Sequence, residues 1–94
     1  MPIYILLSRL SQQGVQTIQS NPSRLREVNR DVEELGAKVL FQWACLGPFD
    51  FVSVVEAPDI ETMSRVSVAL AARGSTKIQT LPALSIDEFL TTLS

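Results

Sequence analysis

The apolar residues of the chain follow two spacings, which alternate along the sequence. Four short segments are rich in β-branched and aromatic residues and are bounded by Gly, Pro or polar residues, as is typical of strands: 3–10, 37–46, 49–56 and 75–81. Two longer segments, 21–35 and 59–73, have apolar residues at steps of three and four, which predicts helices with one apolar side. The predicted order of elements is therefore β-α-β-β-α-β.

Both predicted helices begin and end at residues suited to those positions. Asn21 and Asp59 precede the apolar stripes, and the side chains of Asn and Asp accept an unpaired backbone N–H at a helix N-cap. Gly36 and Gly74 follow the stripes, where the chain commonly adopts a left-handed conformation. We expect the two helices to lie between these pairs of residues.

The connections and the end of the chain carry weaker signals. Residues 11–14 read as a turn, followed by a short helical piece at 15–20, and Pro82 ends the fourth strand. Ser85 and Glu88 have the spacing of a capping box, which predicts a short final helix.

This order predicts an α+β ferredoxin-like fold. Right-handed crossovers place both long helices on one face of a four-stranded antiparallel sheet. The 94 residues suffice for a single domain, 1–94, with residues 84–94 as a C-terminal helical tail.

The strands of this sheet are apolar on both faces. The first strand places Ile3, Ile5 and Leu7 on one side and Tyr4 and Leu6 on the other. An antiparallel sheet with one wet face should instead alternate between apolar and polar residues. Something should therefore cover the face that the helices leave open, and a second copy in a dimeric α/β barrel is the simplest cover. The alternative is that the tail helix folds back over that face.

Strict alternation also assigns the faces of the second strand. It places Val39, Phe41, Trp43 and Cys45 together on one side, and Gln42 among the residues on the other.

Composition excludes several classes of function. The net charge is −2, from 8 basic and 10 acidic residues, which gives no electrostatic basis for binding nucleic acid or an anionic membrane. The chain has no histidine, which removes His-based nucleophile activation, the usual zinc sites and His-ligated haem. We expect no cofactor and no metal. The single cysteine, Cys45, cannot form an internal disulfide, and the apolar N-terminal run lacks a basic leader, so we expect a cytoplasmic protein.

The region between the second and third strands resembles the GYD domain family. The similar residues run from Gly47 through Pro48, Phe49 and Asp50 and continue to Asp59. Further matches are residues 4–7, 13–14, 35–39 and 80–83, so the resemblance covers residues 2–84 and leaves the tail outside it. Phe49 stands where the family signature usually has Tyr. The resemblance implies a dimeric α/β-barrel relative without an agreed activity.

Few residues suggest a binding site. The candidates for a ligand pocket are Asp50, Tyr4, Trp43 and Phe49, beside the turn residues Gly47 and Pro48. Asp50 either bonds amides of the turn or lines a pocket, and the aromatic residues either fill the core and an interface or stack on a flat ligand. Cys45 has no basic neighbour in sequence to activate it, so we interpret it as an inert apolar residue.

Three functions compete. The first is a small oligomeric binding module, for a metabolite or a protein, that dimerises through its sheet. The second is a structural or regulatory assembly domain. The third is an enzyme similar to the cofactor-independent monooxygenases or isomerases of the dimeric barrel superfamily, with Asp50, Tyr4 and Trp43 at work in a pocket between sheet and helices. The absence of catalytic constellations favours the binding module, and the sequence leaves enzyme activity undecided.

Overall fold

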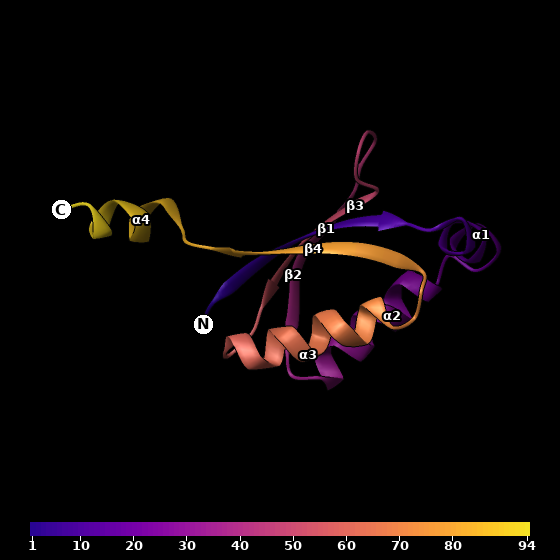
Figure 1. Cartoon of the computed structure of the whole chain (residues 1–94), viewed down its shortest axis with the longest axis horizontal. Coiled ribbons are helices and arrows are strands. Elements are labelled where there is room, and N and C mark those ends of the chain that lie inside the picture. The colour runs from indigo at the N-terminus through magenta and orange to yellow at the C-terminus, as the bar shows by residue number, and fades with distance from the viewer.

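The computed structural model describes all 94 residues and has the predicted order of elements, and the short helical piece expected near the N-terminus is a longer helix (Figure 1). In chain order the elements are β1 (Ile3–Leu10), α1 (Gln12–Ser20), α2 (Arg24–Glu34), β2 (Lys38–Ala44), β3 (Phe51–Glu56), α3 (Ile60–Ala71), β4 (Thr76–Ala83) and α4 (Ile86–Thr92).

The strands form one four-stranded antiparallel sheet in the order β2-β3-β1-β4. Helices α2 and α3 lie together on one face of it, and α1 lies at one end (Figure 1). The other face, which we call the open face, has no helix against it. This is the α+β ferredoxin-like fold that the order of elements predicts, and the prediction is confirmed.

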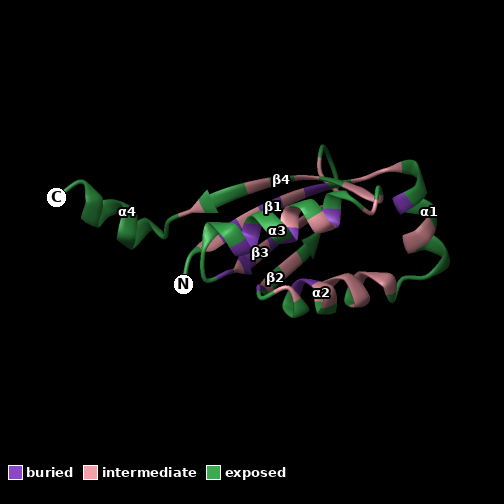
Figure 2. Ribbon diagram, turned by 60° about the horizontal axis from the view of Figure 1, so that its bottom comes forward, coloured by how far each residue is buried: buried purple, intermediate pink, exposed green.

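The core lies between the sheet and helices α2 and α3. Met63, Val66 and Val55 are its largest fully buried side chains, and the buried positions gather where α3 crosses the central strands (Figure 2). On α3 the buried apolar residues Met63, Val66 and Leu70 recur at steps of three and four, which confirms the predicted stripe. Ile60, which the same pattern assigned to the stripe, is the first residue of the helix and is exposed.

A β-bulge in β2 overturns the predicted faces of that strand. Val39 pairs with Val55, but the next pair is Phe41 with Val54, so Leu40 is the extra residue. One added residue moves everything after it to the opposite face. Phe41 and Trp43 therefore lie on the open face, whereas Val39 and Gln42 face the helices.

Helix α1 begins earlier than predicted. Residues 11–14 are its first turn rather than a separate turn, because the Ser11 hydroxyl accepts a hydrogen bond from the Gly14 amide, 3.1 Å, and caps the helix. The same hydroxyl donates to the carbonyl of Gly74, 2.9 Å, and so fixes α1 against the turn that follows α3.

Helix α2 begins later than predicted. The Asn21 side chain accepts a bond from the Ser23 hydroxyl, 2.6 Å, instead of capping the helix, and Pro22 and Ser23 form a turn before Arg24. The helix exit was predicted correctly, since Gly36 has a φ of 103°.

The ends of α3 agree with the sequence. The Asp59 carboxylate accepts a hydrogen bond from the Thr62 amide, 2.8 Å, and Gly74 has a φ of 73° after the helix. Hydrogen bonding by the Thr62 side chain and amide lowers the pKa of Asp59.

Strand β4 runs past its predicted end. Pro82 lies within the strand opposite Tyr4, and the strand continues to Ala83. This is compatible with the position of β4 at the edge of the sheet, because alternate backbone N–H groups of an edge strand face away from its one neighbour.

The tail helix α4 does not cover the open face. It lies beyond the end of β4, away from the sheet, in both views (Figures 1 and 2). Its apolar residues Ile86, Phe89, Leu90 and Leu93 are all exposed. Ser85 caps it by accepting from the Glu88 amide, 3.1 Å, while the Glu88 carboxylate accepts from the Ser85 hydroxyl rather than from the backbone N–H of a full capping box. The alternative of a folded-back tail is therefore wrong for this structure.

Gly14 offers a test of the packing of α1. A Cβ atom at Gly14 would overlap the carbonyl oxygen of Ser75, although alanine stabilises an exposed helix interior by about 1 kcal/mol over glycine. We expect Gly14→Ala to lower the free energy of unfolding by about 1–3 kcal/mol, measured by urea denaturation. Gln13→Ala, at an exposed position of the same helix, should change it by less than about 0.5 kcal/mol. A stabilised Gly14→Ala variant would contradict the close contact.

Candidate functional site

The open face of the sheet is a broad apolar surface. Its centre consists of half-buried side chains from β1 and β3, flanked by exposed side chains from β2 and β4: Ile3, Ile5, Leu7, Val52, Val54, Phe41, Trp43 and Leu81. Large apolar side chains of this chain are more often exposed than buried. A large contiguous apolar patch on a soluble protein is typical of an interaction site.

Two aromatic rings stand out on this face. Phe41 and Trp43 stack with their centroids 5.8 Å apart and their planes 8° from parallel, and their exposed fractions are 58% and 53%. A pair of rings that supports itself in this way needs little further ordering when it docks against a partner.

The hairpin loop between β2 and β3 rises above the sheet, on the side away from α2 and α3 (Figure 1). Leu46, in this loop, is fully exposed. Phe49, half-buried at the other end of the loop, lies under the Arg9 guanidinium, which is 5.3 Å from the ring centroid. The loop thus extends the apolar surface of the open face.

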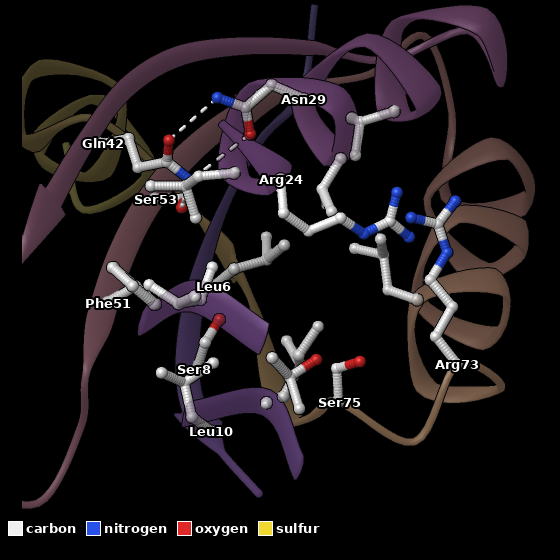
Figure 3. A pocket seen from close by; sticks show the side chains of 18 of the residues that line it. Leu6, Ser8, Leu10, Arg24, Asn29, Gln42, Phe51, Ser53, Arg73 and Ser75 are labelled. Carbon is white, nitrogen blue, oxygen red and sulfur yellow. Dashed lines mark hydrogen bonds between the residues drawn. The ribbon is translucent and has the colours of Figure 1, made fainter. Parts of the chain in front are cut away.

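A cavity lies on the opposite face of the sheet, under helices α1 and α2 and the end of α3 (Figure 3). It measures about 90 Å³, several times the roughly 10–15 Å³ that a single water molecule requires on such a measure. It exists because the sheet presents small or polar residues toward the helices at Ser8, Ser53 and Gln42, where larger apolar side chains would have filled the space.

One wall of the cavity is a closed network of amides. The Asn29 side chain donates to the Gln42 carbonyl oxygen, 2.8 Å, and the Gln42 amide nitrogen donates to the Ser53 hydroxyl, 3.2 Å (Figure 3). The network joins α2 to the two strands below it and satisfies polar groups that would otherwise be buried alone.

Two arginines, Arg24 and Arg73, line the same cavity (Figure 3). Arg24 is bonded to Glu27 at 3.0 Å and Arg73 to Asp31 at 2.7 Å. Glu27 and Asp31 lie one turn apart on α2, so this helix holds both guanidinium groups along the same edge of the cavity.

Comparison with known proteins identifies the relatives of this fold. The model of the GYD domain matches residues 4–93. This chain belongs to the GYD domain family. A relative from Thermus thermophilus, a glutamine synthetase and cystathionine beta-lyase binding protein, is 45% identical over 94 residues, which cover 99% of each chain. No solved structure matches the chain.

The family match corrects one expectation from the sequence. The resemblance was expected to end near residue 84, but the GYD domain extends through α4 to residue 93. The tail helix is therefore part of the domain rather than an addition to it.

The four pocket candidates from the sequence lie apart in this GYD domain. Tyr4 is buried in the core, Trp43 lies on the open face, and Phe49 and Asp50 lie at the end of the hairpin loop. None of the four lines the cavity between sheet and helices. Cys45 is free and partly exposed next to β2.

Asp50 connects the hairpin to the centre of the sheet. Its carboxylate accepts a hydrogen bond from the Leu10 amide, 2.8 Å, its own amide donates to the Ser8 carbonyl, and its carbonyl accepts from the Cys45 amide. The sequence left two roles open for Asp50, hydrogen bonding to turn amides or lining a pocket. In the structure it bonds a backbone amide, but that amide belongs to β1 rather than to the turn.

The residues that line the cavity were not singled out in the sequence. Arg24 and Arg73 are near helix ends, where a basic residue usually lies in solvent. For Gln42 the sequence predicted a strand face but no hydrogen-bond partner. The available signal was Ser8 and Ser53, two small polar residues on strands at positions that face the core. No group of three His, Cys, Asp or Glu side chains is placed to hold a metal ion. No helix has the length and apolar character needed to cross a membrane.

Asp50 can be tested as a structural residue. Asp50→Ala removes the acceptor of the Leu10 amide, and we expect the free energy of unfolding to fall by about 1–2 kcal/mol. Asp50→Asn keeps an oxygen acceptor and should lose less. Urea denaturation at neutral pH measures both changes, and equal stability of all three proteins would contradict this role.

Proposed function

We propose that this GYD domain is a small protein-binding module of the cytoplasm: two copies pair through their open faces, and the dimer binds metabolic enzymes. The observation that carries the proposal is the apolar open face with its stacked Phe41 and Trp43, in a chain whose close relative is a binding protein for two enzymes. We expect the protein to be located in the cytoplasm, because its one cysteine has no disulfide partner within the chain.

A second copy is the occupant that the open face fits best. Four strands about 4.8 Å apart and about seven residues long present a face of roughly 400 Å² in projection, and side-chain relief increases its accessible area. A standard interface buries about 800 Å² on each partner, so the open face and the projecting hairpin loop together approach that size. A twofold contact would place each apolar centre on an identical apolar centre.

The charges around the open face are compatible with such pairing. Exposed Arg9 and Lys77 lie at one end of the sheet, and exposed Lys38 lies beside Glu56 at the other. The centre between them carries no charged side chain, so no unpaired charge would be buried in the contact.

The enzymes bound by the relative suggest the partners of this chain. We propose glutamine synthetase and cystathionine β-lyase as the partner proteins, because the two GYD domains are 45% identical along their whole length. The open face would already be occupied in the dimer, which leaves the outer surfaces and the exposed apolar side of α4 for an enzyme.

The dimer can be tested by placing a charge on the open face. Trp43→Glu should convert a dimer into a monomer at micromolar concentration, because two carboxylates would be buried in the paired sheets. Sedimentation equilibrium measures the mass, and circular dichroism should show an intact fold, since Trp43 is half exposed. Val68→Glu, on the exposed side of α3, should remain dimeric.

Removal of the tail helix α4 shows whether the dimer is formed by the sheets or by α4. A chain that ends at Leu84 should remain dimeric if the sheets form the contact. A monodisperse, folded monomer of the unaltered chain or of this shortened chain would overturn the proposed dimer.

Enzyme binding can be measured directly. The immobilised wild-type domain should bind glutamine synthetase or cystathionine β-lyase from the same organism in biolayer interferometry. Trp43→Glu should bind at least about tenfold more weakly, because a monomer cannot engage two sites at once. If the wild-type domain bound neither enzyme, the proposed partners would be wrong. The proposed dimer would be unaffected, because sedimentation equilibrium tests it separately.

A further inference from the structure

We propose that the cavity between the sheet and the helices is a separate binding site, for a small organic carboxylate with an apolar body. The arginines at its edge would hold the acid group, and the apolar interior would hold the carbon chain. This site lies on the opposite face of the sheet from the proposed dimer contact, so it does not depend on that contact.

The first argument is an unpaired donor. The Nη2 atom of Arg73 bonds to Asp31, but the Nη1 atom is buried and has no hydrogen-bond partner. A buried N–H group of a charged side chain without an acceptor is costly, and native proteins rarely leave one. An anionic oxygen in the cavity would accept this bond without displacing Asp31.

The second argument is that two guanidinium groups line one cavity. Arg24 and Arg73 are both among its lining residues, and their acidic partners Glu27 and Asp31 lie one turn apart on α2. A guanidinium group has five N–H donors, and a carboxylate can accept from two of them at once. Each arginine has one bond to a carboxylate of α2, so free N–H groups remain on both.

The third argument is the position of these groups relative to the apolar interior. The Arg24 and Arg73 side chains are 36% and 28% exposed, so they lie at the mouth of the cavity. Behind them the walls are mainly aliphatic, formed by residues from both sheet and helices such as Leu6, Val28, Val39, Leu70 and Ile78. A ligand with one charged end and an apolar body matches this division.

The charge balance favours a carboxylate over a phosphate. Glu27 and Asp31 already neutralise the two arginines formally, so a single added negative charge can be accommodated better than two. A carboxylate also matches the planar geometry of a guanidinium group. The Ser8 hydroxyl and the amide network at the inner wall could bond a second polar group on the body.

The test uses a series of straight-chain acids from acetate to octanoate, each titrated into the full-length protein by calorimetry at neutral pH. We expect affinity to rise with chain length until the cavity is full and then to level off or fall, because each buried methylene adds apolar contact. Hexanoate should bind at least about tenfold more tightly than hexanol, which has the same chain and no charge. Inorganic phosphate alone should bind more weakly than hexanoate.

Two variants and a control locate the site. Arg73→Gln should weaken hexanoate binding about tenfold or more and leave hexanol binding unchanged. Ser8→Val, which fills part of the cavity, should weaken hexanoate more than acetate. Arg65→Ala should change neither, because Arg65 is an exposed residue of α3 outside the cavity lining. Circular dichroism confirms that each variant is folded before it is titrated.

The outcomes that overturn the proposal are distinct from those that overturn enzyme binding or the dimer. Equal binding of hexanol and hexanoate would remove the role of the arginines. No binding of any acid up to about 10 mM would remove the site. Tighter binding of phosphate than of hexanoate would mean that the site serves phosphate groups instead.

Discussion

The constraint on which this structure depends is that two helices cover only one side of a sheet that is apolar on both sides. Val55, Val66 and Met63 are fully buried between the sheet and the helices. The same strands project a second set of apolar side chains toward the other side, and neither α3 nor α4 reaches them. In a domain of this length the covered side supplies a small core, so burying the open face is the main way in which the domain can gain further stability.

The sheet separates two surfaces of different chemistry. The open face is apolar and aromatic and has no charged side chain at its centre, as suits a macromolecular contact. The cavity on the other side is narrow, with aliphatic walls, two guanidinium groups at its mouth and an amide network at its inner wall. Because the strands alternate, Ile5 and Leu7 serve the first surface while Leu6 and Ser8 serve the second, so either surface can change without rebuilding the other.

The cavity also lies next to the helices that form the outer surface of the domain. The cavity is formed partly by α1 and α2, and α1 is bonded to the turn after α3 through Ser11. An acid bound between Arg24 and Arg73 would join α2 to the end of α3. A protein that binds metabolic enzymes on its outer surfaces would then carry a ligand next to the helices that form those surfaces.

The sequence alone determined the order of elements, the extent of α3 and the two-sided apolar character of the sheet, because each of these depends on local spacing and on residues such as Asp59, Gly36 and Gly74. The hairpin signature also led to the GYD domain family. The tertiary structure decided the rest. The bulge at Leu40 turned Phe41 and Trp43 to the open face, a change of register that period-two alternation cannot reveal. Arg24 and Arg73 lie far apart along the chain, and only the packing of α2 against the end of α3 brings them to one cavity. Spacing along a chain specifies which face of an element is apolar, but the neighbours of a side chain depend on how the elements pack.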